Sequence, residues 1–376
     1  MGNPVYLDHN ATTTPRPKAV TVMVAALAEA GNPSSVHGAG REARKTIEEA
    51  RSCVAALVNA NPDDVIFTSG GTESNHLAIA GCGRKRVLVS AIEHPSVRNC
   101  GGEIVPVDRN GIVDVVELDA MLMADATPAL VSVMLANNET GVIEPIDEIA
   151  EIARRHNALM HSDAVQAAGK IAVDFKTLGV DKMSLSAHKI GGPAGVGALI
   201  ANEKARGVLK ATAFGGGQER GLRQGTENIA GIAGFGAAAK AALSDLSDHA
   251  QIAKMRDRLE TAIMKMSPDT IIFGADADRL PNTACFTMPG SDSDTQVMAL
   301  DLAGIAVSAG SACASGKVKA SGVLHAMGID DDQAKSALRV SFGWDSKDGD
   351  VDAFLNAWGD LYERIHKDGK IAQPAA

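Results

Sequence analysis

A short apolar run ends in small polar residues and glycines at LSAHKIGGP, residues 185–193. Met183 and Leu185 predict a buried strand, and the glycine pair after it predicts a loop where the backbone closely approaches another group. Lys189 therefore lies at a predicted strand end. A lysine amine held there can form a Schiff base with a carbonyl compound, above all pyridoxal phosphate. A surface lysine before a turn is the alternative interpretation of this segment.

Around this segment, strand-like and helix-like patterns alternate along the chain. Apolar residues recur at helical spacing between Ala43 and Leu57, and Ile146 to His156 repeats that pattern. Strand-like runs occupy residues 65–67, 87–90, 129–135, 159–164, 183–186 and 196–200. This alternation predicts an α/β fold, with a mostly parallel sheet between layers of helices.

The last third of the chain has a different pattern. A long helix is predicted from His249 to Met266 and an amphipathic helix from Val351 to Ile365. Strands are predicted at residues 271–273, 284–286, 305–307 and 338–340, and a helix at 294–302. We expect a smaller α+β domain of residues 1–12 and 251–376, carrying Cys313 and Arg339. Residues 13–250 form the predicted large domain.

Composition narrows the classes of function. The chain has 376 residues, 45% apolar content and a net charge of -10, which disfavours nucleic acid or an anionic membrane as the main partner. Its five cysteines show no Cys-x-x-Cys spacing, so neither a disulfide framework nor a metal site is expected. Without a signal-like N-terminus or a long apolar run, a soluble cytoplasmic protein is the expectation.

Two segments suit an anionic, ring-shaped ligand. The sequence TSGGTESN, residues 68–75, joins a strand to a helix, and the helix amides near Gly71 and Thr72 could bind an anion. An ordinary capped turn is the alternative. In HSDAVQ, residues 161–166, Asp163 could hold a protonated pyridine nitrogen and Gln166 could donate to a ring oxygen. Asp163 could equally cap the next helix.

Other polar segments lie near predicted strand ends. His94 could stack on a flat ring and exchange protons, or be an ordinary loop histidine. Asn138 offers an amide to a substrate, or belongs to a turn, and Arg339 within an apolar strand requires a carboxylate. Thr226 lies near the end of the glycine-rich stretch 214–228, which is too long and too conformationally free for an ordinary turn. Cys313 lies among small residues in SAGSACASG, 308–316, a composition typical of an exposed loop.

Together these motifs resemble the pyridoxal-phosphate cysteine desulfurases of the nitrogen-fixation and iron–sulfur-assembly type, in the class V aminotransferase family. The resemblance runs from YLDHNATT, residues 6–13, through NPSSVH, residues 32–37, to LRVSFG, residues 338–343. It implies a type I aminotransferase fold, a homodimer, L-cysteine as substrate, and a sulfur-acceptor protein such as an iron–sulfur scaffold as partner. The implied reaction converts L-cysteine to L-alanine and leaves the sulfur on Cys313 as a persulfide.

The resemblance also implies individual roles. Lys189 would hold the cofactor covalently, His94 would stack on its ring, and Asp163 and Gln166 would bind the ring nitrogen and hydroxyl. The remaining implied roles are phosphate binding by Gly71, Thr72, Ser186, His188 and, from the second subunit, Thr226; substrate-carboxylate binding by Asn138 and Arg339; and sulfur acceptance by Cys313.

The sequence departs from the family pattern in three places. Ala194 stands where a lysine is common, the chain between His94 and Ile104 is short, and GKVKAS, residues 316–321, replaces Leu-Glu-Pro-Ser. The last two concern partner choice and the loop after Cys313, not the ring chemistry. Two alternatives remain open: a selenocysteine lyase or related aminotransferase that does not use Cys313, and an inactive scaffold that binds an assembly partner.

Overall fold

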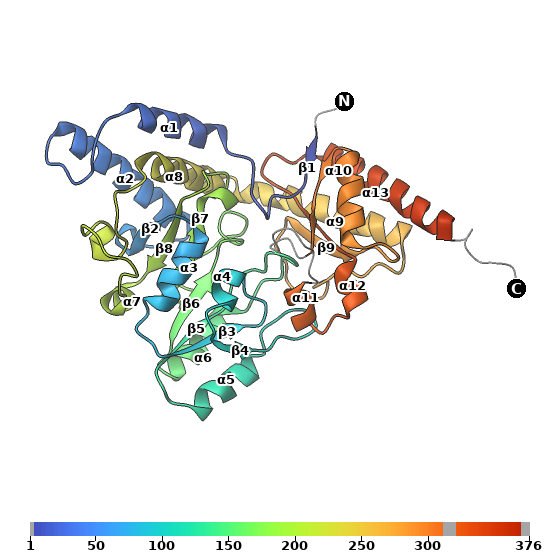
Figure 1. Ribbon diagram of the computed structural model, residues 1–376, viewed down its shortest axis with the longest axis horizontal. Helices are drawn as coiled ribbons and strands as arrows, with labels where there is room; N and C mark the ends of the chain where they lie inside the picture. Colours follow the sequence, from blue (N-terminus) through green and yellow to red (C-terminus); the bar gives the residue numbers. More distant parts are fainter. Residues whose placement is uncertain (1–3, 311–320, 370–376) are drawn as a thin grey trace, which may run out of the picture.

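The computed structural model describes residues 4–310 and 321–369, and in it the chain forms two parts that lie side by side (Figure 1). The larger part is built on a seven-stranded sheet. In spatial order its strands are β2 (Val65–Thr68), β8 (Gly197–Ala201), β7 (Lys182–Ser186), β6 (Leu159–Asp163), β5 (Ala129–Ser132), β3 (Arg86–Ser90) and β4 (Glu103–Val105).

The large sheet is mostly parallel, as the alternating pattern predicts. Strands β7, β6, β5, β3 and β4 pair in parallel, whereas β8 runs antiparallel to both of its neighbours. Strands β2, β5 and β8 are buried on both faces, so their apolar residues form continuous runs and do not alternate with polar ones. Because such a run looks the same in a parallel and in an antiparallel strand, the sequence does not reveal that β8 is antiparallel.

Helices cover both faces of this sheet. They are α1 (Pro17–Ala28), α2 (Gly38–Leu57), α3 (Gly71–Ala80), α4 (Pro95–Arg98), α5 (Val115–Ala124), α6 (Ile146–Arg155), α7 (Glu203–Val208) and α8 (Ile229–Ser244), with short 3₁₀ turns at η1 (Pro62–Asp64), η2 (Ala187–Lys189), η3 (Glu219–Gly221) and η4 (Leu246–Asp248). The predicted apolar face of α2, including Ile47 and Val54, is buried. Helix α8 approaches α2 closely at Gly236, where a Cβ would lie 2.6 Å from the Cα of Ala50.

The smaller part contains an antiparallel sheet in the order β11 (Ser308–Ala309), β12 (Ala337–Ser341), β9 (Thr283–Thr287). The N-terminal strand β1 (Val5–Tyr6) pairs in parallel with β10 (Ile305–Ala306). Its helices are α9 (His249–Met266), α10 (Ser293–Leu302), α11 (Gly322–Ala326), α12 (Asp331–Lys335) and α13 (Asp348–Gly369).

The predicted strand at 271–273 is present only as one antiparallel bridge. Ile272 pairs with Phe286 of β9, and two backbone hydrogen bonds flank the pair, from Phe273 to Cys285 at 2.9 Å and from Thr287 to Ile271 at 3.0 Å. The chain then turns at Gly274, which has a φ of +70°, so the pairing extends no further. Only the Phe273 side chain is fully buried there, while Ile271 is 37% exposed.

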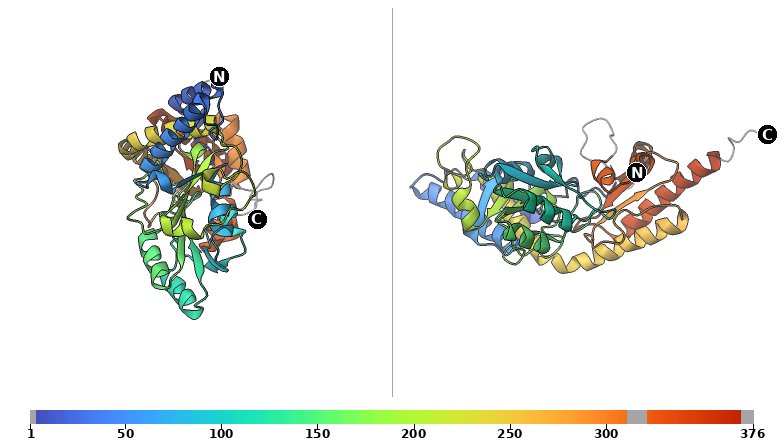
Figure 2. Two further views of the ribbon diagram at one scale, coloured as in Figure 1. Left: turned by 90° about the vertical axis from the view of Figure 1, so that its left-hand side faces the viewer. Right: turned by 90° about the horizontal axis from the view of Figure 1, so that it is seen from below.

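The two largest clusters of buried apolar side chains fit the proposed division of the chain, although a smaller cluster joins Met134 of the larger part to Leu324 of the smaller part. One lies around the large sheet, and the other joins Leu7 to apolar side chains of α9, β9, β12 and α13, with Trp358 and Phe354 at its centre. Helix α9 begins at the edge of the larger part and runs along the smaller part (Figure 2). The boundary near residue 250 remains a proposal.

Within the described residues, no single helix is long and apolar enough to cross a membrane, although the bent pair Ile229–Ser244 and Leu246–Met266 passes by length and composition.

Candidate active site

A cavity of about 280 Å³ opens where the parallel strands β3, β5, β6 and β7 end. Carboxyl ends of parallel strands are the usual place for ligands in such sheets. Arg339 reaches the cavity from β12 of the smaller part. Ten of the residues predicted from the sequence line it: Gly71, Thr72, His94, Asn138, Asp163, Gln166, Ser186, His188, Lys189 and Arg339.

Lys189 enters the cavity from the 3₁₀ turn that follows β7. Its Nζ donates to the carbonyl oxygen of Asn10 and, at 2.7 Å, to that of Ala11. The neighbouring His188 is 3.2 Å from the Thr12 hydroxyl, and burial together with the Lys189 charge lowers the pKa of His188 to about 4. Both residues are thus held against the N-terminal segment, which crosses beside the cavity.

The start of α3 provides an anion site at one end of the cavity. Gly70 precedes the helix and makes no side-chain cap, so the first amides are available to a ligand. At Gly71 a Cβ would lie 2.9 Å from a methyl of Val165, so this position has no room for a larger residue. Thr72 and Ser186 add hydroxyls to the same cavity.

Asp163 caps a turn and not the next helix, and it also lines the cavity; its role toward a ring nitrogen stays a prediction. Its Oδ1 accepts from the backbone amide of Val165 at 3.0 Å, which caps the turn after β6. Its Oδ2 accepts from Asn75 Nδ2 at 2.7 Å and lies beside the cavity. A carboxylate fixed in this way can hold a cationic ring nitrogen without moving.

His94 is held as a neutral imidazole. It caps α4, and its Nδ1 accepts from the backbone amide of Ser96 at 3.1 Å, which leaves the proton on Nε2. Burial lowers the pKa of His94, the nearby Asp163 carboxylate opposes this effect, and Lys189 adds to it. The ring lines the cavity and is available to a flat ligand.

Arg339 has an unused donor at the cavity. Its terminal nitrogens donate to the Asn138 carbonyl oxygen at 3.0 Å and to Asp8 Oδ1 at 2.7 Å. Its Nε is buried and has no hydrogen-bond partner among the described residues, and the same holds for Oδ1 of Asn75. Because both residues line the cavity, these two atoms are available to a polar ligand.

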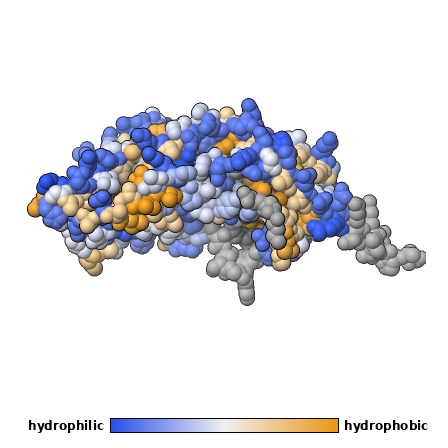
Figure 3. All heavy atoms as spheres, turned by 90° about the horizontal axis from the view of Figure 1, so that it is seen from above, coloured by the Kyte–Doolittle hydropathy of each residue, from blue (hydrophilic) through white to orange (hydrophobic). Residues whose placement is uncertain are grey.

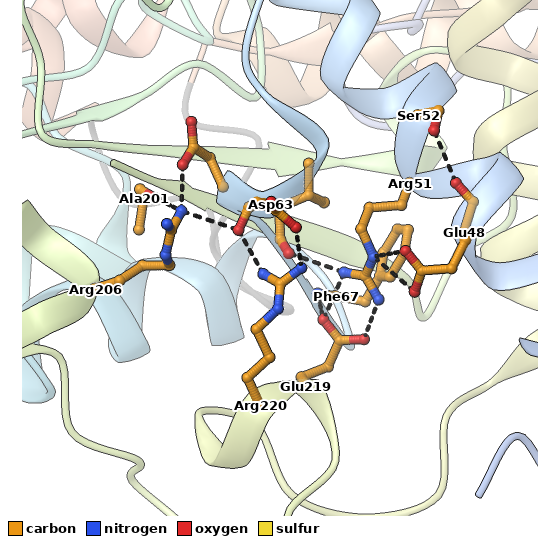
Figure 4. Close-up of polar contacts among 11 residues, drawn as sticks. Glu48, Arg51, Ser52, Asp63, Phe67, Ala201, Arg206, Glu219 and Arg220 are labelled. Carbon is orange, nitrogen blue, oxygen red and sulfur yellow. Dashed lines mark hydrogen bonds and ion pairs between the residues drawn. The ribbon is translucent and has the colours of Figure 1, made fainter. Parts of the chain in front are cut away.

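Two predicted residues are not among those lining the cavity. Thr226 is exposed, on the segment after η3. That segment is anchored by a buried ion pair between Arg51 and Glu219, at 2.8 Å, and by Arg220, which contacts Asp63 (Figure 4). Glu219 and Arg220 have positive φ angles of 45° and 58°, so these contacts hold a strained turn. Cys313 lies outside the described residues.

Sequence reasoning assigned no role to three polar residues that organise this cavity. Asn75 binds Asp163, Asn10 accepts from Lys189, and Lys170 contacts Gln166. Asn75 and Asn10 belong to motifs quoted above, but their contacts join segments far apart in the sequence. Lys170 follows Gln166 by four residues, a helical spacing that could have suggested the contact.

Glu93 lies behind the cavity and offers a test by pH. Its Oε1 accepts from Ser90 Oγ and from the Met134 amide, each at 2.6 Å, while burial raises the pKa of Glu93 to about 8. Between pH 4.5 and 8 the folded protein keeps this proton and the unfolded chain releases it. This carboxyl therefore lowers the free energy of unfolding by roughly 1 kcal/mol per pH unit as the pH rises.

Glu93→Gln removes this titration. Urea unfolding of the variant and of the wild type at pH 6, 7 and 8 is expected to show the variant gaining stability relative to the wild type with each unit. A difference that stays constant over this range would contradict the buried, protonated state of Glu93. The quantity to compare is the difference in unfolding free energy between the two proteins at each pH. Glu144, with a pKa of about 8, titrates in the same direction in both proteins and cancels in that difference.

The described residues include no group of three or more His, Cys, Asp or Glu side chains placed to hold a metal ion. Four cysteines are described and free: Cys82 and Cys285 are buried, Cys53 is half-buried and Cys100 is exposed.

Comparison with known proteins places the chain among enzymes with this fold. The model of the aminotransferase class-V family matches residues 5–354. An IscS-like cysteine desulfurase of Mycobacterium tuberculosis is 41% identical over 371 residues, which are 93% of this chain and 94% of that protein.

Solved structures give the same result. A NifS-like protein from Rickettsia africae has a TM-score of 0.90 and 35% identity, and the match covers 96% of this chain and all of that one. A structure described as SspA in complex with cysteine has a TM-score of 0.78 and 28% identity, covering 90% of this chain and 98% of that one. The expected type I aminotransferase fold is thereby confirmed, and the chain belongs to the class V aminotransferase family.

Proposed function

We propose that this protein is a cysteine desulfurase that converts L-cysteine to L-alanine and transfers the sulfur to Cys313. The observation that carries the proposal is the cavity in which Lys189, Asp163, His94 and Arg339 meet, in a chain 41% identical to an IscS-like cysteine desulfurase. A lysine, a carboxylate, an imidazole and an arginine at strand ends suit a cofactor that binds an amino acid.

The residues of the cavity fit pyridoxal phosphate. The uncapped start of α3 at Gly71 and Thr72, with Ser186 and His188 beside it, suits the phosphate. Asp163 suits the ring nitrogen and His94 the ring face, while the unpartnered Nε of Arg339 suits a substrate carboxylate. Pyridoxal phosphate, when bound, supplies an electron sink for bond breaking at the carbons of an amino acid.

The chain's own groups then perform the proton and sulfur transfers. Lys189 Nζ takes the proton from Cα of the substrate, and the Asp163 side chain orients the ring. Arg339 and Asn138 hold the carboxylate so that Cα faces Lys189. The Cys313 thiolate attacks the substrate sulfur, the Cβ–S bond breaks, Cβ receives a proton, and L-alanine leaves. The sulfur stays on Cys313 as a persulfide for a sulfur-acceptor protein, such as an iron–sulfur scaffold.

Mass spectrometry tests this proposal directly. Protein loaded with pyridoxal phosphate and exposed briefly to L-cysteine is expected to gain one sulfur atom on the peptide that contains Cys313. Cys313→Ser should fold, bind the cofactor and lose most of its sulfide release, with Cys100→Ser as the matched control at an exposed cysteine. Full activity of Cys313→Ser with cysteine would favour the alternative of a selenocysteine lyase or related aminotransferase that does not use Cys313.

We further propose that the active unit is a homodimer, with Thr226 of each chain completing the phosphate site of the other. Two observations support it. Thr226 is exposed on a firmly anchored segment. Val20, Val24 and Leu27 form an exposed apolar face of α1, where apolar side chains gather on the surface (Figure 3). The cytoplasmic location expected from the sequence stays a prediction.

Mixing two inactive subunits tests the shared site. In a dimer of one Lys189→Ala chain and one Thr226→Ala chain, one site receives both substitutions and the other receives neither. We therefore expect activity to return on mixing and refolding at limiting cofactor. It should reach about a quarter of that of the wild type, because about half of the dimers are mixed and one of their two sites is intact. The parallel mixture of Lys189→Ala with Asp163→Ala, which both act within one chain, should remain inactive. A fully active wild-type monomer at low concentration would contradict the proposal.

A further inference from the structure

A buried lysine lies behind the cavity and is not used by the proposed function. Lys170 follows β6, and its Nζ donates to Asn10 Oδ1 at 2.8 Å and to Gln166 Oε1 at 2.7 Å. Burying an amine is costly unless its hydrogens are bonded. Here both acceptors are amide oxygens, and neither belongs to a carboxylate.

These contacts determine how two amides are oriented. A lysine ammonium donates and cannot accept, so each amide must turn its oxygen toward Lys170. The Gln166 nitrogen then points the other way, where it donates to the Asn10 carbonyl oxygen at 3.0 Å. One hydrogen of Nε2 remains for the cavity that Gln166 lines. The Asn10 nitrogen is likewise directed to Thr283 Oγ1 at 2.9 Å.

The orientation does not depend on the charge of Lys170. Burial lowers its pKa well below the usual range, and Lys189 and Arg339 lower it further. The two histidines in its field, His9 and His249, also have lowered pKa values, chiefly because they are buried. A neutral amine still has a hydrogen for each of the two oxygens. It could also accept from an amide, but a turned Gln166 would then face the Asn10 carbonyl oxygen with its own oxygen, so both forms of Lys170 favour the same orientation.

The backbone is shaped to bring this lysine inside. Gly169 has a φ of +75°, and a Cβ there would lie 2.9 Å from a methyl of Ile190 and 3.0 Å from the Cβ of Ala242. Only glycine fits this conformation and this space. The turn at Gly169 directs the side chain of Lys170 inward, toward Gln166.

We propose that Lys170 is a positioning residue that fixes the Gln166 amide so that an N–H, and not the carbonyl oxygen, faces the ring oxygen of the cofactor. The inference rests on the proposed function, because it concerns the same cofactor. Without Lys170, the Gln166 oxygen loses its donor. Only the contact of Nε2 with the Asn10 carbonyl oxygen then opposes a turn of the amide that would bring the oxygen toward the cavity.

A double-mutant cycle tests the proposal, with Lys170→Met, Gln166→Leu and the double variant. The readouts are the dissociation constant for pyridoxal phosphate and the pH at which the visible absorption of the bound cofactor changes. Lys170→Met is expected to weaken binding roughly 3- to 10-fold and to shift the absorption midpoint, as the loss of one hydrogen bond predicts. In the Gln166→Leu background it should add almost nothing. Unchanged readouts in Lys170→Met, or fully additive effects, would overturn the proposal.

Lys182→Met is the matched control. Lys182 is also buried, and its Nζ donates to the Ala78 carbonyl oxygen at 2.9 Å, but it does not line the cavity. This variant should lose thermal stability and keep the wild-type absorption midpoint. A shift equal to that of Lys170→Met would show that any buried lysine has this effect, which would also overturn the proposal.

Gln166→Glu provides a second route if Lys170→Met does not fold. A carboxylate beside Lys170 can pair with it but has no N–H for the ring, so cofactor binding should weaken while the melting temperature of the cofactor-free protein rises. A lower melting temperature would overturn the proposal. Failure of the wild-type protein itself to bind pyridoxal phosphate would instead count against the proposed function.

Discussion

Replacing Lys189 by alanine is expected to lower the rate of alanine formation from L-cysteine by about 10³-fold or more, because the substitution removes the base that moves the Cα proton. The Lys189 amine is directed into the cavity by the turn after β7, and its two carbonyl contacts, to Asn10 and Ala11, hold it beside Asp163 and His94. In the described part of the cavity no other lysine is among the lining residues.

Borohydride labelling tests separately whether Lys189 is the lysine that binds the cofactor. Reduction of the wild-type protein with bound pyridoxal phosphate should fix the cofactor to the peptide that contains Lys189. The peptides with the buried Lys170 and Lys182 serve as internal controls and should remain unlabelled. Label on either of these, or a Lys189→Ala variant within tenfold of wild-type activity, would contradict the assignment.

Arg339→Lys is expected to raise KM for L-cysteine by about 10- to 100-fold, with a smaller change in kcat. The guanidinium has donors in three directions: its terminal nitrogens bind Asp8 and the Asn138 carbonyl oxygen, and its buried Nε has no hydrogen-bond partner among the described residues. An ammonium cannot serve these three directions from one position, so the substrate carboxylate loses its charged hydrogen bond.

Arg279→Lys is the matched control for the loss of a buried arginine. Arg279 forms a two-fold ion pair with Glu260 in the smaller part, with its shortest contact at 2.6 Å, and does not line the cavity. Both variants should lose stability, but only Arg339→Lys should change KM. Equal KM values in Arg339→Lys and the wild type would show that the carboxylate binds elsewhere.

Local pattern predicted much of the fold and the cavity. Strands β3, β6 and β7 and the helix α9 follow from apolar runs and helical spacing. Asp163, Gln166 and Lys189 line one cavity because each follows the end of a parallel strand, a rule that needs no knowledge of distant contacts. Their individual roles remain predictions.

What the sequence could not show depends on contacts between remote segments. Asn10 meets Lys189 and Gln166 across more than 150 residues, and no periodicity marks that approach. The antiparallel β8 carries the same apolar run as its parallel neighbours. The apolar triplet at 271–273 forms a single bridge to β9 before a turn ends the pairing.

The central claim is that the protein removes sulfur from L-cysteine and releases L-alanine. The most direct test incubates the protein, loaded with pyridoxal phosphate, with L-cysteine and a thiol reductant, and measures alanine and sulfide in the same sample. We predict equal amounts of the two products, at a rate that falls with Lys189→Ala. Sulfide accompanied by pyruvate and ammonia in place of alanine, or no turnover of cysteine, would contradict it.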